Sequence, residues 1–248
     1  MEAMILAAGL GTRMKPLTDS IPKALIPING KTLLEIVIRD LIRNGFKHIV
    51  INTYYLGEQI VEFINTHKFD AEIIISEEEE LLNTGGGLKN AQQYFSGKHP
   101  ILIHNVDVLS RLDLKDIYNK HLESNSVATL AVSKRETARY FLFNNDGILK
   151  GWKNKKTNEV KFSSDEQTGL SELAFSGIHV VSPEIFGLLP NEDAFSITDA
   201  YLDIAKTLSI QAYIHEAKDW LDVGKIEVLP EAELFQLRME NGELRIES

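Results

Sequence analysis

A glycine-rich turn followed at once by cationic side chains is the first feature of this sequence that could do chemistry. The run Leu6-Ala7-Ala8-Gly9-Leu10-Gly11-Thr12-Arg13-Met14 ends an apolar segment, and Lys15 and Lys23 follow it closely. Glycines let backbone N–H groups approach an anion that a side chain would keep away, and an arginine adds a fork-shaped cation for phosphate oxygens. The pattern predicts a phosphate-binding loop.

Two common phosphate-binding motifs do not account for this turn. A dinucleotide-binding fingerprint needs a third glycine three residues after Gly11, where the sequence has Met14. A P-loop ending in Gly30-Lys31-Thr32 needs its first glycine where the sequence has Leu25. Taken by itself, Gly9-Leu10-Gly11 also fits an ordinary turn between a strand and a loop.

Two aspartates follow apolar segments that are far apart in the sequence. Asp107 comes after the run 101–105, so we expect its carboxylate at the carboxyl end of a sheet, where open α/β folds bind ligands. This position fits a turn or helix cap as well as a metal ligand. Asp222 lies among apolar neighbours in Trp220-Leu221-Asp222-Val223-Gly224, and a carboxylate in such a setting needs a cationic partner.

Further glycines mark places where a ligand or another backbone could approach the chain. The run Thr84-Gly85-Gly86-Gly87 predicts either a loop against a flat base or merely an adaptable loop. Ser176-Gly177 interrupts an apolar strand, which indicates a close approach to its backbone. In contrast, Glu77 to Glu80 lacks the spaced ligands of a calcium loop and is interpreted as solvated surface. His104 is interpreted as a packed histidine rather than a proton shuttle.

The elements that must position these residues alternate between short apolar runs and amphipathic stretches, which is typical of βαβ units. Predicted strands are 4–8, 49–52, 72–76, 101–105 and 127–132. Predicted helices are 33–44, 57–65, 88–95, 114–122 and 197–208. Thr32 and Glu35 form a capping box before the first helix. The pattern predicts an α/β fold with a mainly parallel sheet.

The pattern changes after about residue 139. Two runs, 140–143 and 148–152, flank Asn144-Asn145-Asp146-Gly147 and predict an antiparallel hairpin. Residues 154–169 are polar and predict a loop, after which strands are expected at 173–181 and 210–215, a short helix at 183–189, and a helical tail from about 230. We therefore expect one domain over 1–248 with an inserted α+β portion at about 139–195.

Composition excludes several classes of function. The 248 residues include 26 Lys and Arg against 36 Asp and Glu, and a formal charge of -10 argues against a nucleic-acid partner. Cysteine is absent, so thiol chemistry and disulfides are excluded. The apolar start is too short for a signal peptide or a membrane span. We expect a cytoplasmic protein without a membrane partner.

The glycine-rich run, together with Pro16-Leu17-Thr18 and the segment Pro22-Lys23-Ala24-Leu25-Ile26-Pro27-Ile28, resembles the signature of the sugar-1-phosphate nucleotidyltransferases. The resemblance extends along nearly the whole chain through Asn83-Thr84-Gly85-Gly86-Gly87, His104-Asn105-Val106-Asp107-Val108, Phe175-Ser176-Gly177-Ile178 and Trp220-Leu221-Asp222-Val223-Gly224. Within that family the chain is most similar to the N-acetylmuramate-1-phosphate uridylyltransferases, followed by the mannose-1-phosphate guanylyltransferases.

The resemblance implies a Rossmann-like three-layer αβα fold and a reaction between a nucleoside triphosphate and a sugar 1-phosphate. It implies Mg²⁺ held by Asp107 and Asp222, with Arg13 and Lys23 completing the catalytic set. The implied nucleotide-binding residues are Leu6, Ala7, Ala8, Gly9, Gly11, Thr12, Arg13, Lys23, Thr84, Gly85 and Gly86. The implied sugar-binding residues are Asn105, Val106, Ser176, Gly177 and Lys153.

The sequence departs from the family in two places. Val106 stands where most relatives have glycine, and the usual Glu-Glu-Lys-Pro stretch is missing, so Lys150 and Lys153 both remain candidates for the sugar phosphate. No hexapeptide-repeat domain is expected at the C-terminus. UTP is the expected nucleotide and GTP the alternative, and the sugar remains open. A non-catalytic nucleotide-sugar-binding subunit is the rival class, whereas Met14 argues against a dehydrogenase.

Overall fold

The computed structural model describes residues 1–240, which are built around a mainly parallel sheet. Apolar runs form its central strands because helices on both faces bury the side chains of each strand. The parallel strands, from one side to the other, are β6 (Ile101–Asn105), β1 (Glu2–Leu6), β4 (His48–Thr53) and β5 (Glu72–Glu77). The predicted parallel core is therefore confirmed.

One long strand, β12 (Ser171–Val181), joins this core to the rest of the sheet. Its last four residues pair antiparallel with β6, and its first three pair antiparallel with β9 (Arg139–Phe143). β8 (Ala128–Ser133) lies antiparallel to β12, and β13 (Ile210–His215) lies parallel to β8. The sheet is therefore mixed, as predicted.

Helices follow most of the parallel strands, and three of the helices begin at polar caps. The helices are α1 (Leu33–Arg43), α2 (Gly57–Thr66), α3 (Asn83–Asn90), α4 (Leu114–Glu123), α5 (Ile197–Ile204) and α6 (Leu229–Glu240). At the start of α1, the Thr32 hydroxyl accepts a hydrogen bond of 3.1 Å from the Glu35 N–H, as the capping box predicted. Caps at Asp113 and Ser196 begin α4 and α5 in the same way.

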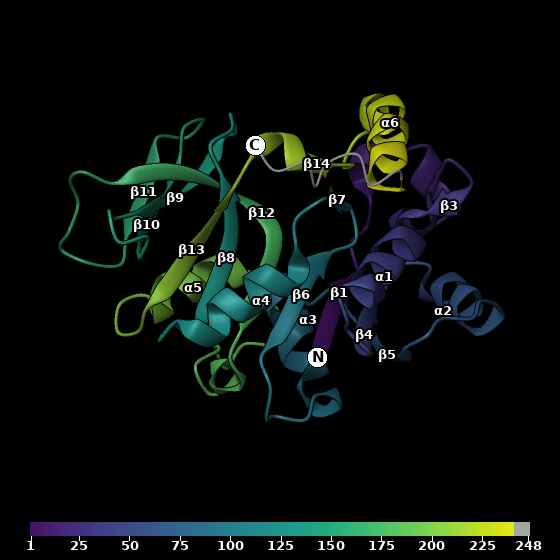
Figure 1. Ribbon diagram of the computed structural model, residues 1–248, viewed down its shortest axis with the longest axis horizontal. Helices are drawn as coiled ribbons and strands as arrows, with labels where there is room; N and C mark the ends of the chain where they lie inside the picture. Colours follow the sequence, from purple (N-terminus) through teal and green to yellow (C-terminus); the bar gives the residue numbers. More distant parts are fainter. Residues whose placement is uncertain (241–248) are drawn as a thin grey trace.

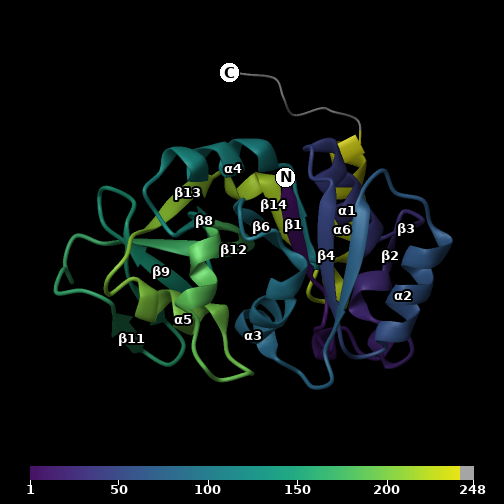
Figure 2. The ribbon, with the colours of Figure 1, turned by 90° about the horizontal axis from the view of Figure 1, so that it is seen from below.

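The sheet separates two hydrophobic layers, because successive side chains of a strand point to opposite faces. Ala3 and Ile5 of β1 pack with α1, α2 and α4, whereas Met4 packs with α3 and α5. Figure 2 shows the same arrangement, with α4 on one side of the strands and α3 and α5 on the other. This is the predicted Rossmann-like three-layer α/β fold.

The second half of the sheet contains a strand where the sequence predicts a loop. β10 (Leu149–Asn154) pairs with β9 as the expected hairpin, and β11 (Glu159–Phe162) then pairs antiparallel with β10. The prediction of a loop over 154–169 is therefore wrong for residues 159–162. Val160 and Phe162 alternate with charged residues, but all four residues of β11 are exposed, so backbone pairing with β10 rather than burial forms this strand.

A small two-stranded sheet lies beside the carboxyl end of β6 (Figure 1). β7 (Val108–Ser110) pairs antiparallel with β14 (Trp220–Asp222), and α6 packs against β7. Neither strand was predicted, because each is only three residues long. Among residues 1–240, no helix combines the length and the apolar character that a membrane span requires.

Candidate active site

The predicted phosphate-binding turn begins where β1 ends. The strand stops at Leu6, so Ala7 and Ala8 belong to the following loop rather than to the strand predicted over 4–8. Gly11 has a φ of 64°, and a Cβ there would lie 2.8 Å from Cγ2 of Thr18, whose hydroxyl donates a hydrogen bond of 2.8 Å to the Gly11 carbonyl. Only glycine fits this position without strain.

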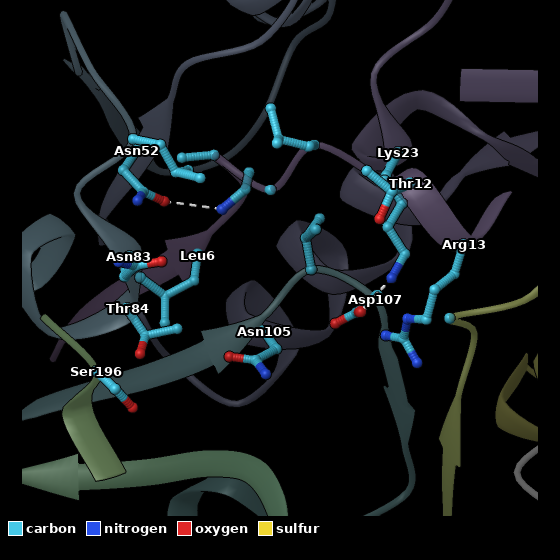
Figure 3. A pocket seen from close by; sticks show the side chains of 18 residues that line it. Leu6, Thr12, Arg13, Lys23, Asn52, Asn83, Thr84, Asn105, Asp107 and Ser196 are labelled. Carbon is cyan, nitrogen blue, oxygen red and sulfur yellow. Dashed lines mark hydrogen bonds and ion pairs between the residues drawn. The ribbon is translucent and has the colours of Figure 1, made fainter. Parts of the chain in front are cut away.

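The two predicted cations after this turn lie beside the two predicted metal-binding carboxylates. Lys23 is buried and forms an ion pair with Asp107, which follows β6. Arg13 is exposed, and its Nη1 lies 3.9 Å from Oδ2 of Asp222. Figure 3 shows Lys23 and Arg13 pointing toward Asp107 from the same side of the pocket.

Backbone pairing brings Asp222 next to Asp107 although the two residues are far apart in the sequence. Asp222 lies opposite Val108 in the β7–β14 pair, and the Val223 N–H donates a hydrogen bond of 2.8 Å to the Asp107 carbonyl. Both side chains face the same cavity. Burial raises the pKa of Asp222, and the nearby Asp107 carboxylate raises it further, while Lys23 and Arg13 oppose that change.

These two carboxylates have the properties of a divalent-cation site. Oδ1 of Asp222 is buried and has no hydrogen-bond partner among residues 1–240. Two carboxylates that face one cavity repel each other unless a cation lies near them, and carboxylate oxygens are the ligands that Mg²⁺ prefers. No third His, Asp or Glu in the described part of the chain completes a metal cluster, so substrate phosphates and water would supply the remaining ligands.

A cavity of about 420 Å³ lies over the phosphate-binding turn and the ends of the parallel strands (Figure 3). The predicted nucleotide-binding residues that line it are Leu6, Ala7, Ala8, Gly9, Gly11, Thr12, Arg13, Lys23 and Thr84. The lining residues that sequence reasoning did not identify are Leu10, Asn52, Leu81, Asn83, Ser196 and Gly224. Asn105, Val106 and Asp107 complete the lining. The cavity lies at the carboxyl ends of β1 and β6, where the α/β fold predicts a ligand.

The glycines after Thr84 do not form the predicted loop. Gly85, Gly86 and Gly87 lie inside α3, so the helix expected at 88–95 begins earlier, at Asn83. A Cβ on Gly85 would overlap the ring of Phe195, and one on Gly86 would overlap the Asp193 carbonyl. Close packing of α3 against the segment before α5 therefore requires these two glycines, and neither lines the 420 Å³ cavity.

Asn52 connects the 420 Å³ cavity to the acidic run. Its Oδ1 accepts a hydrogen bond of 2.8 Å from the Ala7 N–H, and its Nδ2 donates one of 2.7 Å to Oε1 of Glu78. The interpretation of Glu77 to Glu80 as surface is wrong for Glu78, which is 8% exposed and whose pKa is raised by burial. A Cβ on Gly87 would lie 2.6 Å from Nδ2 of Asn52, so this contact needs glycine there.

A second cavity of about 680 Å³ adjoins the first and contains both predicted metal-binding carboxylates. Ser176 and Gly177 line it, as does Asn105, whereas Val106 lines only the first cavity. Gly177 has a φ of 70°, and a Cβ on it would lie 2.6 Å from Nδ2 of Asn105. Four residues line both cavities: Arg13, Asn105, Asp107 and Ser196.

The two lysines considered for the sugar phosphate fall outside both cavities. Lys153 forms an ion pair of 2.9 Å with Glu172, and Lys150 forms one of 3.3 Å with Glu166. Neither lysine lines the 420 Å³ or the 680 Å³ cavity. His104 is buried, and burial lowers its pKa to about 4, which confirms the interpretation of a packed histidine.

Comparison with known proteins identifies a family model and relatives that match most of this chain. The family model for nucleotidyl transferases matches residues 2–238. The N-acetylmuramate alpha-1-phosphate uridylyltransferase of Neisseria meningitidis is 30% identical over 240 residues, which cover 94% of this chain and 97% of the relative. The UTP–glucose-1-phosphate uridylyltransferase of Synechocystis is 28% identical over 91% of this chain, which spans only 61% of that relative.

A solved structure has the same fold over nearly the whole chain. HddC from Yersinia pseudotuberculosis, in complex with GMP-PN, superimposes with a TM-score of 0.72 at 24% sequence identity. The match covers 94% of this chain and 98% of HddC.

Proposed function

This chain belongs to the nucleotidyl transferase family, with sugar-1-phosphate nucleotidyltransferases as its relatives, and we propose that it transfers a uridylyl group from UTP to a sugar 1-phosphate. The proposed sugar is N-acetylated, as in N-acetylmuramate 1-phosphate. The products are a nucleotide-sugar and pyrophosphate.

The proposed step needs no proton abstraction. An oxygen of the sugar 1-phosphate attacks the α-phosphorus of the triphosphate, and the bond from that phosphorus to the oxygen bridging to the β-phosphate breaks. Pyrophosphate leaves with the bridging oxygen and its electron pair. Because a phosphate monoester is already an anion at neutral pH, the protein has to align two polyanions and neutralise their repulsion.

In this proposal the chain's own cations act on the triphosphate. Arg13, at the exposed edge of the glycine turn, binds the departing β- and γ-phosphates. Lys23, which is buried beside Asp107, neutralises the α-phosphoryl oxygens. Asp107 and Asp222 would hold the Mg²⁺, which when bound would supply further charge neutralisation.

One observation carries the proposal. Two adjoining cavities, of about 420 and 680 Å³, meet at the Asp107 carboxylate, and Arg13 and Asn105 also belong to both. A reaction between a nucleotide and a sugar phosphate needs two separate binding spaces with one charged junction between them. A single-substrate hydrolase or a nucleotide sensor would not need the second space.

Relatives favour UTP, and one observation favours GTP as the second candidate. The full-length match to the Neisseria uridylyltransferase supports a uracil nucleotide. The match to the D-glycero-alpha-D-manno-heptose 1-phosphate guanylyltransferase of Campylobacter jejuni, 27% identical over 90% of this chain and 95% of that relative, supports GTP and a reaction of the mannose-1-phosphate guanylyltransferase type. The alternative of a non-catalytic nucleotide-sugar-binding subunit is disfavoured. Such a protein has no need to keep Arg13, Lys23, Asp107 and Asp222 together.

The decisive experiment is a matrix of the four nucleoside triphosphates against a panel of sugar 1-phosphates, with Mg²⁺ present and pyrophosphate release as the readout. The panel contains the 1-phosphates of N-acetylmuramate, N-acetylglucosamine, glucose, mannose and a heptose. We expect the largest kcat/KM for UTP with an N-acetylated sugar. A maximum with GTP would replace the nucleotide in the proposal, and nucleotide binding without turnover for any pair would favour the non-catalytic rival.

A further inference from the structure

The second cavity contains a cation, Arg135, that has no part in the reaction as described so far. Arg135 lies on the connection between β8 and β9 and lines the 680 Å³ cavity together with Asp107 and Asp222. The residue is partly buried.

Contacts on two sides hold the Arg135 guanidinium in one orientation. Its central carbon lies 3.8 Å from the ring centroid of Trp220, and its Nη2 donates a hydrogen bond of 2.6 Å to the Phe175 carbonyl. Trp220 is itself fixed, because its Nε1 donates a hydrogen bond of 2.7 Å to the Ser176 carbonyl. A stacked guanidinium with one end anchored keeps its remaining N–H groups in a fixed plane.

No salt bridge in the described part of the chain neutralises Arg135, although the charge of Asp222 acts on it. Within residues 1–240 no carboxylate forms an ion pair with it, whereas Lys161, on the same cavity wall, is paired with Asp199 at 2.9 Å. The Nε of Arg135 is buried and has no hydrogen-bond partner in this part of the chain. A partly buried cation with an unsatisfied donor is unfavourable unless a ligand supplies the missing acceptor.

We propose that Arg135 binds the phosphate of the sugar 1-phosphate and holds it at the junction of the two cavities, an inference that rests on the proposed function. The planar fork of an arginine matches two oxygens of one phosphate, and Ser176, Gly177 and the two aspartates line the same cavity as this fork. Lys150 and Lys153 are already neutralised by glutamates, so they do not provide this charge.

A purely structural role for Arg135 makes a different prediction. If its only task were to support Trp220 and thereby β14, its loss would displace Asp222 and weaken the use of both substrates. A phosphate-binding role instead acts on one substrate, the acceptor.

The test compares steady-state kinetics of the wild-type enzyme with those of Arg135→Ala, Arg135→Lys and Lys153→Ala, using the substrate pair that turns over fastest. Arg43→Ala, which removes an exposed arginine paired with Asp40, is the matched control for loss of a guanidinium.

We expect Arg135→Ala to lower kcat/KM for the sugar 1-phosphate by roughly 10²–10³, the cost of one preorganised group, while KM for the triphosphate is unchanged. Lysine at this position should restore only part of the loss, because it lacks the planar fork.

Added guanidinium chloride should restore activity to Arg135→Ala but not to Arg13→Ala at the same concentration, and melting temperatures check that each variant is folded. Equal losses for both substrates, or no rescue of a folded variant, would overturn the assignment to the acceptor phosphate. A larger loss of acceptor kcat/KM in Lys153→Ala than in Arg135→Ala would assign the phosphate to Lys153 instead.

A binding measurement separates this inference from the proposed function. Glucose 1-phosphate and glucose are titrated calorimetrically into protein saturated with a non-hydrolysable triphosphate analogue, so that Arg13 and Lys23 are occupied. We expect glucose 1-phosphate, but not glucose, to bind the wild type and Arg43→Ala, and binding to be lost in Arg135→Ala. If no substrate pair turns over but this pattern holds, the proposed function fails and the Arg135 site stands. Equal binding of glucose 1-phosphate by the wild type and Arg135→Ala would overturn the assignment of the phosphate to Arg135. Absence of binding by the wild type would overturn it as well.

Discussion

At the scale of single residues, charge pairing is the main feature of this site. Each cation predicted to bind phosphate lies beside one carboxylate predicted to bind metal: Lys23 with Asp107, and Arg13 with Asp222. The pairing is uneven, because Oδ1 of Asp222 is buried without a partner. The ionised Asp222 carboxylate therefore makes the folded state less stable, a cost that a purely structural residue would not impose.

This cost leads to a prediction in which activity and stability change in opposite directions. Asp222→Asn should lower kcat/KM by at least about 10²–10³, because one preorganised charged group is lost. The same variant should unfold at higher urea concentration at pH 7. The raised pKa means that the ionised carboxylate disfavours the folded state, and this penalty is fully present above that pKa.

Pyrophosphate release and urea denaturation measure the two effects. Asp203→Asn is the matched control, because it removes an exposed carboxylate of α5 that is paired with Lys206. It should leave both kcat/KM and the urea concentration of unfolding nearly unchanged. Asp107→Asn should lose as much activity as Asp222→Asn. Near-normal turnover in either active-site variant would remove that aspartate from the catalytic set.

At the scale of elements, the site depends on how closely α3 approaches the segment that precedes α5. The Gly85 N–H donates a hydrogen bond of 3.0 Å to the Phe195 carbonyl, and the Thr84 hydroxyl accepts one of 3.1 Å from the Ile197 N–H. These contacts place Thr84 and Ser196 on the wall of the 420 Å³ cavity. Glycines in α3 therefore shape the cavity indirectly, through helix packing.

Gly86→Ala tests whether packing or helix propensity dominates in α3. Alanine in an open helix position would stabilise by about 0.5–1 kcal/mol relative to glycine. A Cβ on Gly86 would overlap the Asp193 carbonyl, and overpacking costs about 1–3 kcal/mol. We expect a net loss of stability, seen as a melting temperature lower by several degrees.

Gly187→Ala is the matched control, because no atom lies within 4 Å of the Cβ position there. Its melting temperature should stay close to that of the wild type. A melting temperature of Gly86→Ala at or above that of Gly187→Ala would mean that α3 can move away from Asp193 without cost.

At the scale of the whole molecule, three histidines buried near β12 couple the stability of the fold to pH. Burial lowers the pKa of His104 and His121 to about 4, and that of His179 to about 3. His121 links α4 to the sheet through hydrogen bonds to Thr129 and Ser182. Both ring nitrogens of His179 lack a partner within residues 1–240.

These histidines predict a loss of stability in acid. Because each pKa is lower in the folded chain than its ordinary value of 6.5, the unfolded chain takes up protons first as the pH falls. The free energy of unfolding therefore decreases as the pH falls from 6.5 toward 4, by about 1 kcal/mol per pH unit for each histidine that remains neutral in the fold.

His179→Phe should remove one third of this dependence, and His179→Leu serves as a smaller replacement if phenylalanine crowds Tyr201. Urea denaturation at pH 7.5 and pH 5 measures the difference in unfolding free energy for each variant. His99→Phe, at an exposed position, is the control and should keep the wild-type dependence. A pH dependence of His179→Phe and His179→Leu equal to that of the wild type would show that His179 takes up its proton without unfolding.

Much of this protein was determined by local sequence. The parallel strands, α1 with its capping box, and the turn at Gly9-Leu10-Gly11 depend on apolar runs, caps and glycines that act within a few residues. Arg13, Lys23 and Asp107 were identified because each follows such a local element. Arg13 and Asp107 come together because parallel strands end at the same edge of a sheet, whereas Lys23 reaches Asp107 from the short 3₁₀ segment Lys23–Leu25.

The features that only the tertiary structure decided depend on partners far away in the chain. β11 and the β7–β14 pair exist because exposed or very short segments find a backbone partner, and the burial of Glu78 depends on Asn52. The orientation of Arg135 depends on Trp220, which lies 85 residues further along the chain. Short-range periodicity cannot encode such contacts, because the free energy that selects them is gained only when the whole sheet has assembled.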